Sequence, residues 1–429
     1  MDTSSAEPAL PLDDSTSADN STSAEDVEEV EIEVVDEPRR ADFQEKVRRL
    51  RQVLRDRGIQ SALISSVPNF FWLTSGGRNY VSLYTQQGVA SMFVDADRVV
   101  LVTSNIEAER ITAEELAGLG SIQVFAKPWF WDDSAHLNRL MTLGRGFKPE
   151  PDTGDILAPR FAELRATLTP FEVGKYRVLA RQCGELLGEV ARGLRRGVTE
   201  REVAGAVAGA CYSRGIHPIV LLVGADERMD KWRHSLPTAQ VAKSRLLITL
   251  SGRRHGLIAS LTRVVHFGAL PPDSPLRHKH TAVTYVDSVA IASTCIGATS
   301  DAIMARIQRA YEERGFRNEW LHHHQGGATG YRTREWKAEP GVRYYVGSPQ
   351  AFAWNPSIAG TRSEDTILVV GGGGEGGVGS GGGGSEGGRD GGGEAACPEI
   401  LTATPDWPMI RHVVDGVEVL RPDVLEILD

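Results

Sequence analysis

The feature that most constrains this chain is a pair of strand-like segments near its middle, residues 246–268, which read LLITLSGRRHGLIASLTRVVHFG. Gly256 separates the two segments, and the second one contains the pair Thr262 and Arg263. Runs rich in Leu, Ile, Val and Thr and bounded by glycine are typical of strands. We therefore expect a fold in which these two strands are paired within a sheet.

The composition limits the class of protein. With 429 residues, of which 41% are hydrophobic, the chain can form one large or two ordinary domains. Its four cysteines are far apart and form no CxxC motif, which indicates reduced thiols rather than a disulfide framework or a zinc site. Neither a signal-peptide pattern nor a stretch long enough to cross a membrane is present. We expect a cytoplasmic protein with no membrane partner.

The first part of the chain is strongly acidic. Residues 1–37 contain thirteen acidic residues and no Lys or Arg, whereas the whole chain has a net charge of −10. A segment rich in Ser, Thr, Asp and Glu cannot bury enough apolar surface to fold alone. We predict that residues 1–38 form a disordered acidic tail, either a solubilising arm or an arm that binds a partner. The near-neutral remainder gives no indication of nucleic-acid binding.

Residues 39–165 alternate between helical and strand patterns. The helical segments are 43–59 and 105–120, and the strand-like segments are 61–66, 88–95, 98–104 and 122–131. The second helical segment ends at a glycine, as helices often do. This alternation predicts a compact α/β domain with a mixed sheet.

Residues 166–429 begin with two amphipathic helical segments separated by residues 196–198. Thr199 is a predicted N-cap, and Glu202 completes a capping box. Glycine then supplies sixteen of the residues from 371 to 393, which is typical of a flexible coil. We predict a disordered Gly-rich loop over 371–396. An enlarged loop is favoured over an interdomain linker, because about thirty residues beyond it cannot form a core of their own.

Taken together, these segments resemble the creatinase/aminopeptidase P (M24) family of the "pita-bread" fold over most of residues 40–370. The landmarks that carry the resemblance are Thr169, Glu172, Gly197, Thr199, Glu200, Gly256, Thr262, Arg263, Phe267 and Gly268. The resemblance implies an α/β (α+β) protein with a creatinase-type N-terminal domain, residues 39–165, followed by a pita-bread domain, residues 166–429. It also implies a homodimer.

The resemblance further implies five metal-ligand positions, which the family fills with two aspartates, a histidine and two glutamates. The residues at these positions here are Thr249, Ser260, Gly327, Asn355 and Glu364. A dinuclear Mn²⁺, Zn²⁺ or Co²⁺ site needs several carboxylates. His323 and His324 could bind one metal, but adjacent residues on a strand point to opposite faces. We therefore expect no metal cofactor.

Two residues are predicted to be catalytic. By its position in the resemblance, His234 is the acid/base residue, a role that requires a pKa near ambient pH; the alternative is a histidine kept for packing. Glu364 is expected to help bind or orient a substrate. Its alternative is an internal ion pair with Arg263, and the sequence leaves both open.

Five residues are predicted to bind substrate: His323, Tyr331, Arg334, Asn355 and Arg263. Arg334 takes the place of a proton-shuttling histidine of the family. Arginine does not exchange its proton at neutral pH, but it recognises carboxylates. This set predicts a pocket for a small polar or anionic molecule, and the alternative is a degenerate pocket closed by its own salt bridges.

Three functions remain in competition. The leading hypothesis is a metal-independent, creatinase-like hydrolase or lyase that acts on a C–N bond of a small-molecule or peptide substrate. The second is a non-catalytic pita-bread binding module, and the third is a metal-dependent Xaa-Pro aminopeptidase. Ligand loss argues against the third. Polar rather than apolar replacements favour the first over the second, because an unused pocket tends to refill with hydrophobic packing.

Overall fold

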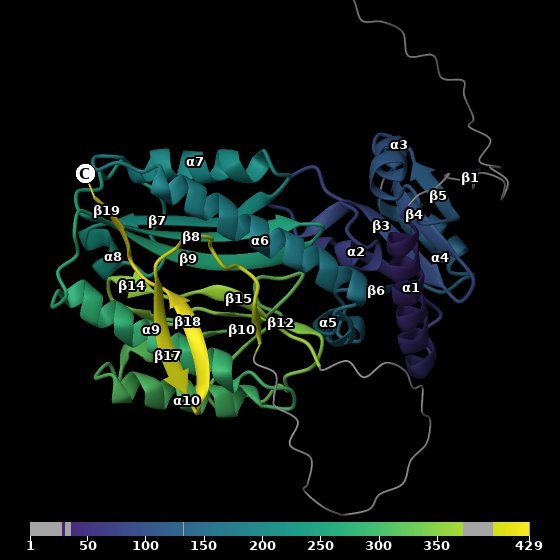
Figure 1. Cartoon of the computed structure of the whole chain (residues 1–429). Helices are drawn as coiled ribbons and strands as arrows, with labels where there is room; N and C mark the ends of the chain where they lie inside the picture. Colours follow the sequence, from purple (N-terminus) through teal and green to yellow (C-terminus); the bar gives the residue numbers. More distant parts are fainter. Residues whose placement is uncertain (1–27, 31–35, 132, 372–397, 429) are drawn as a thin grey trace, which may run out of the picture.

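The computed structural model describes residues 28–30, 36–131, 133–371 and 398–428, which form two domains packed side by side (Figure 1). The smaller domain contains the elements from β1 to α5, and the larger one contains those from α6 to β19. The predicted order, an N-terminal α/β domain followed by a second domain of helices and sheets, is confirmed. None of the helices within the described residues is long and apolar enough to cross a membrane.

The N-terminal domain is built on a six-stranded mixed sheet with the order β1-β5-β4-β3-β2-β6. Its strands are β1 (Glu28–Val30), β2 (Ser61–Ser66), β3 (Gln87–Asp95), β4 (Val99–Ser104), β5 (Ile122–Lys127) and β6 (Glu150–Pro151). Its helical elements are α1 (Glu37–Arg57), α2 (Val67–Leu73), α3 (Ala108–Arg110), η1 (Ile111–Glu115), α4 (Asp133–Leu143) and α5 (Leu157–Ala166). Strands β2, β3 and β4 are antiparallel neighbours, whereas β4 and β5 are parallel.

The helix predicted over residues 105–120 is shorter than expected. Only α3 and the π-helical turn η1 form, and the chain then turns at Gly118 and Gly120, both of which have positive φ. The backbone N–H of Leu116 donates to the carbonyl of Ile111, five residues earlier, at 3.0 Å. This wider turn directs the side chains of Ile111 and Leu116 into the core. In a regular helix with 3.6 residues per turn, residues five apart would point in different directions.

The acidic tail also differs from the prediction. Residues 28–30 form β1, which pairs antiparallel with β5, and α1 begins at Glu37 rather than after residue 38. Asp36 caps α1 by accepting from the backbone N–H of Arg39. Residues 1–27 and 31–35 and residues 372–396 of the predicted Gly-rich loop lie outside the described residues.

The C-terminal domain contains two sheets between two pairs of helices. Its helical elements are α6 (Pro170–Arg192), α7 (Glu200–Tyr212), α8 (Glu227–Lys231), α9 (Pro275–Ser293), α10 (Ser300–Glu313) and η2 (Glu319–His322). The first sheet has the order β19-β9-β8-β7, with strands β7 (His217–Ala225), β8 (Arg245–Arg254), β9 (Leu257–Phe267) and β19 (Leu425–Ile427). In Figure 1, α6 and α7 lie along one side of the strands, and α9 and α10 lie along the other.

The second sheet has the order β11-β10-β12-β15-β16. Its strands are β10 (Gly326–Thr329), β11 (Trp336–Lys337), β12 (Gln350–Trp354), β15 (Asp365–Val369) and β16 (Glu399–Ile400). Two hairpins complete the domain, β13 (Ser357–Ile358) with β14 (Thr361–Arg362), and β17 (Met409–Val414) with β18 (Val417–Pro422). The predicted pairing of the two central strands is confirmed, because β8 and β9 are antiparallel neighbours over their whole length.

Both helices that open the second domain begin at capping boxes. Thr199 and Glu202 bond reciprocally at the start of α7, as predicted, and Thr169 and Glu172 do the same at the start of α6. Each box satisfies two N–H groups that the first turn of a helix leaves without a partner. The helix boundaries in this region are therefore readable from the sequence.

A buried ionic cluster joins the two domains. Lys46, on α1, is fully buried and lies 2.7 Å from a carboxylate oxygen of Asp42 and 2.8 Å from one of Glu172, on α6. The Tyr331 hydroxyl donates to Glu172 at 2.5 Å, and the Thr169 hydroxyl donates to Asp42. One cation from the first domain thus neutralises carboxylates from both domains in a region without water contact.

Replacing Lys46 with Met is expected to destabilise the protein strongly. The change leaves two buried carboxylates without their cation, and breaking a buried ion pair in this way costs about 3–5 kcal/mol. Chemical denaturation followed by circular dichroism measures the loss.

Arg48→Met on the same helix is the matched control. Arg48 is exposed and pairs with Glu45 at the surface, so its replacement should leave the unfolding midpoint almost unchanged. Equal effects of the two changes would show that the cluster does not hold the domains together.

Candidate functional site

Four hydroxyl side chains form one patch on the β8–β9 hairpin. Thr249 is paired across the strands with Thr262, and Ser251 with Ser260. The two hydroxyl oxygens of each pair lie 2.8 Å apart. Because residues two apart on a strand share a face, all four side chains lie on the same side of the sheet.

Glu364 completes this patch from the connection between β14 and β15. Its backbone carbonyl accepts from the N–H of Thr262 at 3.0 Å, and its side chain accepts from the Thr262 hydroxyl at 2.8 Å. The Arg334 guanidinium lies 3.5 Å from one carboxylate oxygen, and that of Arg362 lies 3.8 Å from the other. A buried carboxylate is therefore flanked by two guanidinium groups, so its charge is more than balanced.

A cavity of about 140 Å³ opens at this patch. Its walls are Val220, Leu222, His234, Thr249, Ser251, His324, Thr333, Arg334, Asn355, Arg362 and Glu364. Three polar atoms of these residues are buried with no hydrogen-bond partner in the described part of the chain: Nε of Arg334, Nε of Arg362 and Oδ1 of Asn355. Buried polar atoms are normally satisfied, so these three mark a place where a polar ligand can bind.

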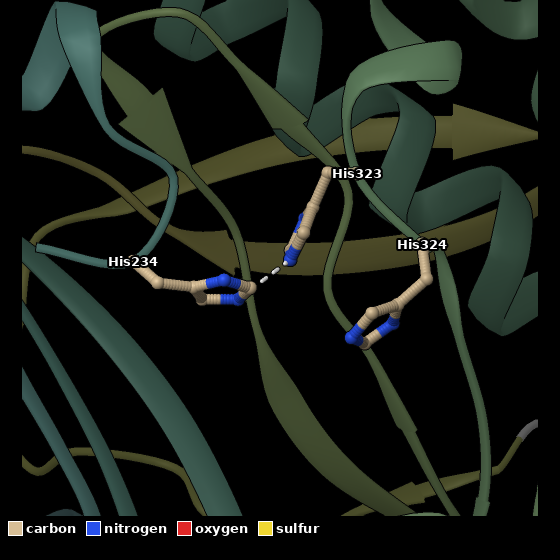
Figure 2. Close-up of side chains that lie close together, drawn as sticks. All are labelled: His234, His323 and His324. Atoms are coloured by element: carbon tan, nitrogen blue, oxygen red, sulfur yellow. Dashed lines mark hydrogen bonds between the residues drawn. The ribbon is translucent and has the colours of Figure 1, made fainter.

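Three histidines lie beside the cavity (Figure 2). Nε2 of His323 lies 3.2 Å from Nε2 of His234, and Nδ1 of His323 lies 3.1 Å from the Ser357 hydroxyl. The ring of His324 is 4.7 Å from that of His323, centroid to centroid. The prediction that His323 and His324 point to opposite faces is wrong, because both lie between η2 and β10 rather than within a regular strand.

These imidazoles are held in the neutral form. Burial, and then the nearby Arg362 guanidinium, lower the pKa of His323 far below its ordinary value. The pKa of His234 is also lowered, first by partial loss of hydration and then by Arg362. Nitrogen atoms of His234, His323 and His324 lie within 4.8 Å of one another and could hold one transition-metal ion. The same guanidinium charge opposes a dication there.

Gly327 lies on β10, between β11 and β12, and does not line the cavity. Its φ is +153°, and a Cβ at this position would lie 2.2 Å from the backbone oxygen of Trp336. The backbone of the neighbouring strand therefore occupies the space that any side chain would need. No larger residue fits at position 327 without moving that strand.

Of the residues predicted to form the site, five line the cavity: His234, Thr249, Arg334, Asn355 and Glu364. His323 and Ser260 do not line the cavity themselves. His323 contacts His234, and Ser260 contacts Ser251, and these two partners do line it. Tyr331 instead belongs to the interdomain cluster with Lys46 and Glu172. The structure thus brings together most of the predicted set and separates Gly327, Tyr331 and Arg263 from it.

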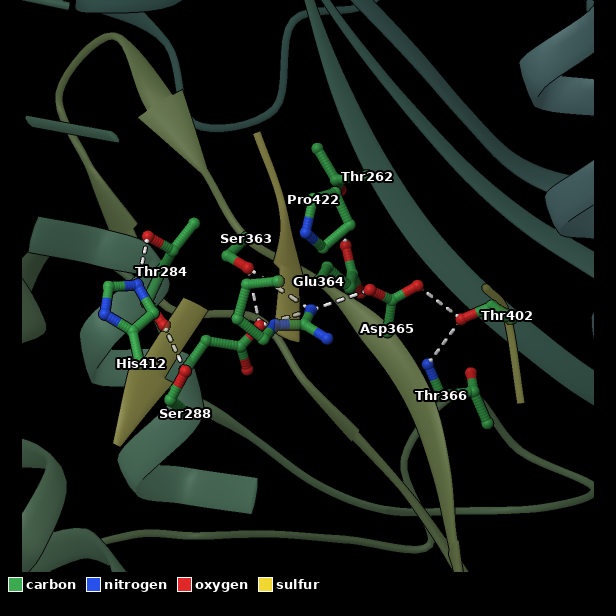
Figure 3. Close-up of polar contacts among 12 residues, drawn as sticks. Thr262, Thr284, Ser288, Ser363, Glu364, Asp365, Thr366, Thr402, His412 and Pro422 are labelled. Carbon is green, nitrogen blue, oxygen red and sulfur yellow. Dashed lines mark hydrogen bonds and ion pairs between the residues drawn. The ribbon is translucent and has the colours of Figure 1, made fainter. Parts of the chain in front are cut away.

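Arg263 is buried and does not line the cavity; it bonds Asp365 and Thr402, which Figure 3 shows beside Glu364. Its guanidinium bonds the carboxylate of Asp365 at 3.0 Å and the backbone oxygen of Thr402 at 2.8 Å. It therefore pairs with Asp365 and not with the Glu364 carboxylate, which the sequence had offered as its partner. The reason is strand geometry, because Thr262 faces Glu364 and the next residue must point the other way.

A second arginine completes this network. Arg421, on β18, lies 2.7 Å from Asp365 and 2.6 Å from Asp287 on α9, and the Ser363 hydroxyl donates to Asp287 at 2.6 Å. Figure 3 shows Thr402 bonded to Asp365, and the oxygen–oxygen distance is 2.6 Å. Two buried cations and two buried carboxylates thus fix the start of β15 immediately beside Glu364.

Sequence reasoning did not place six wall residues in the cavity, namely Val220, Leu222, Ser251, His324, Thr333 and Arg362. Two of them carried a readable signal. Ser251 and Arg362 each lie two residues from a predicted site residue, Thr249 and Glu364, and this spacing places side chains on one face of an extended chain. The turn that brings His324 to the cavity depends on η2, which no sequence pattern indicated.

Each of the two domains matches the model of a known protein family. The model of the family described as "Metallopeptidase family M24" matches residues 174–370, and that described as "Creatinase/Prolidase N-terminal domain" matches residues 46–144. No curated protein matches the sequence.

Several solved structures share the fold. An Xaa-Pro dipeptidase from Bacillus anthracis matches with a TM-score of 0.63 and 16% identity, over 90% of this chain and 100% of its own. A prolidase from Thermococcus sibiricus matches with a TM-score of 0.64 and 13% identity, over 90% and 99%. The N-terminal domain of the FACT complex subunit SPT16 from chickpea matches with a TM-score of 0.57 and 11% identity, over 77% and 94%.

The close contact at Gly327 gives a stability prediction. Gly327→Ala should lower the free energy of unfolding by at least about 2 kcal/mol, because the added Cβ meets backbone atoms that cannot rotate away. Denaturant unfolding of the purified variant measures this change.

Gly341→Ala is the control, since Gly341 has a φ of +78° but no atom within 4 Å of a Cβ. It should cost only the strain of a left-handed backbone, about 1 kcal/mol. If Gly327→Ala is no worse than Gly341→Ala, position 327 has room for a side chain.

Proposed function

Because this chain belongs to metallopeptidase family M24, as a protein of the creatinase and aminopeptidase P type, we propose that it is a metal-independent member that acts on a small anionic substrate. The proposed reaction is cleavage of a C–N bond, with His234 as acid/base and Glu364 orienting the substrate. The proposal depends on three arguments, concerning the donor atoms, the unsatisfied polar atoms and the histidine pair.

The donor set does not fit a pair of divalent cations. Two dications need several carboxylates to neutralise and bridge them. Of the five ligand positions that the family resemblance assigns, only Glu364 carries a carboxylate, and Thr262, Arg334 and Arg362 already engage it. Position 327 cannot carry a ligand histidine without a clash. We propose that four of the five ligands have been lost.

The observation that carries the substrate assignment is the pair of buried, unpartnered N–H donors on Arg334 and Arg362; the third unpartnered atom, Oδ1 of Asn355, is an acceptor and would take a donor group of the substrate. Two guanidinium groups face one carboxylate, so the cavity keeps an excess of positive charge. Guanidinium groups bind carboxylates through paired, charge-assisted hydrogen bonds. A substrate with a carboxylate group would satisfy both the charge and the free N–H donors.

The histidine pair supplies a proton acceptor. We assign Nδ1–H of His323 as the donor to the Ser357 hydroxyl, so that its Nε2 accepts from Nε2–H of His234. This tautomer leaves Nδ1 of His234 as the basic nitrogen. The lowered pKa keeps His234 neutral at neutral pH, as a general base requires. His323 acts here as a positioning residue that fixes the tautomer of His234.

A carboxylate-bearing dipeptide is the substrate class to test first. Structures that share the fold include an Xaa-Pro dipeptidase and a prolidase, and a dipeptide carries one terminal carboxylate that Arg334 and Arg362 could bind. The competing functions predict different outcomes. A binding module would hold the dipeptide without cleaving it, and a metal-dependent peptidase would cleave it only with metal present.

The metal requirement is tested by elemental analysis and by chelation. We expect the purified protein to contain far less than one Mn, Zn or Co per chain, and we expect turnover of an Xaa-Pro dipeptide to be unaffected by EDTA. Activity that EDTA abolishes and Mn²⁺ or Co²⁺ restores would contradict the metal-independent proposal and favour the ordinary peptidase.

The role of Arg334 is tested by Arg334→Gln, which removes the charge but keeps a polar side chain. Binding of the dipeptide should weaken by about tenfold or more, the effect of losing one charge-assisted hydrogen bond. Calorimetric titration measures the affinity. Arg332→Gln is the control, because Arg332 is exposed two residues away and does not line the cavity; equal weakening by both changes would show a general charge effect.

The role of His234 is tested by His234→Ala and by a pH profile. The variant should lose turnover while keeping the dipeptide affinity and melting temperature of the parent protein. In the parent, kcat should fall as pH drops through a pKa below the ordinary histidine value of 6.5, because protonation removes the base. Retained turnover in the variant would exclude His234 as the acid/base residue.

A further inference from the structure

A second and larger cavity, of about 430 Å³, lies between the two domains. Its walls come from the start of α1, the segment after α2, the first turns of α6 and the end of the β8–β9 hairpin. It shares no wall residue with the cavity at Glu364. Its volume is within the range of sites that bind small molecules.

Positive charge predominates in this interdomain cavity. Its walls contain five cationic side chains, Arg39, Arg78, Lys175, Arg253 and Arg254, and three acidic ones, Asp36, Glu114 and Glu115. Glu115 is already paired with Arg78 at 2.7 Å. Across the described ranges, no carboxylate lies within ion-pair distance of Lys175, Arg253 or Arg254.

Neutral groups hold these three cations in place. Arg253 lies over the rings of Phe71 and Tyr80, with centroids 5.5 and 5.2 Å away, and donates to the Tyr80 hydroxyl at 3.3 Å. Arg254 donates to the side chain of Gln182 at 2.6 Å, and Lys175 lies 5.0 Å from the Phe171 ring centroid. These contacts fix the side chains without neutralising them.

Two further atoms lack partners. Nε of Arg253 and Nε of Arg254 are both buried, and neither has a hydrogen-bond partner among the residues that the structure describes. A buried donor left unsatisfied costs free energy that a ligand can recover. Arg253 and Arg254 both line this cavity, and their guanidinium charges could be balanced by an anion bound in it.

The histidines of the cavity report the same positive potential. The pKa of His255 is lowered to about 4, first by burial and then by Lys175 and Arg254. The pKa of His217 is also lowered, by burial and then by Arg253 and Arg78. Cations that disfavour a protonated imidazole favour an anion in the same space.

We propose that the interdomain cavity binds a small phosphate-bearing anion through Lys175, Arg253 and Arg254. A phosphate group carries up to two negative charges and presents three acceptor oxygens, which matches three uncompensated cations better than a single carboxylate does. Arginine donors are arranged to bind phosphate oxygens in pairs. The proposal is independent of the chemistry at Glu364.

A ligand in this cavity would lie between walls that come from both domains. Arg78 and Phe71 belong to the N-terminal domain, and Lys175, Arg253 and Arg254 belong to the C-terminal one. A ligand that binds only the folded, docked arrangement stabilises it by a free energy that grows with the logarithm of ligand concentration above the Kd. The melting temperature should therefore rise with ligand concentration.

The test uses the full chain and inorganic pyrophosphate as the probe, in calorimetric titrations at constant ionic strength. We expect binding at one site per chain, with a matching rise in melting temperature. Succinate, a dicarboxylate, is the comparison, and it should bind at least about tenfold more weakly. Absence of pyrophosphate binding at millimolar concentration, or equal binding of succinate, would overturn the assignment to phosphate.

Charge-removing variants locate the site. Lys175→Gln and Arg254→Gln should each weaken pyrophosphate binding by about tenfold, while keeping the unliganded melting temperature of the parent. Arg201→Gln removes an exposed charge on α7 outside the cavity and should leave the affinity unchanged. Arg334→Gln, at the other cavity, should also leave it unchanged. Unchanged binding in both cavity variants, or equal loss in either control, would contradict the proposal.

Discussion

The arrangement of the site depends on the buried carboxylate of Asp365, which lies between the guanidinium groups of Arg263 and Arg421. This contact joins β9, β15 and β18 through charges that have no access to water. Because neighbouring residues on a strand face opposite sides, securing Asp365 and Arg263 on one side places Glu364 and Thr262 on the other. The carboxylate at the cavity is thus positioned by an ion pair that does not line the cavity.

Charge determines which ligand each cavity can accept. At Glu364, two arginines outnumber one carboxylate, and the histidines beside them are neutral. In a site of low dielectric constant, an excess of positive charge favours an anion over a cation. The walls of the interdomain cavity also carry more cationic than acidic side chains, although the residues are different. We propose a preference for anions at both sites, although their walls have no residue in common.

Much of the fold was predictable because local patterns agreed with the final packing. The capping box at Thr199 predicted the start of one helix, and the paired strands around Gly256 predicted the centre of the sheet. The π turn at Ile111 was not predictable, since the core rather than helix propensity selects its wider spacing. The sequence also could not show which carboxylate pairs with Arg263. Glu364 and Asp365 are adjacent, and only the register of β15 determines which of them faces Arg263.

One feature of the second sheet also bears on how this chain can change in length. Strands β15 and β16 pair antiparallel, with Ile367 opposite Ile400, so the residues on either side of the glycine-rich segment are held together by the sheet itself. Because the sheet holds the two ends of this connection together, the pairing does not depend on which residues connect them. The entropic cost of closing the loop rises only slowly with the number of residues in it. This edge of the domain is accordingly a point where evolution or design can accept an additional folded module without changing the register of the sheet.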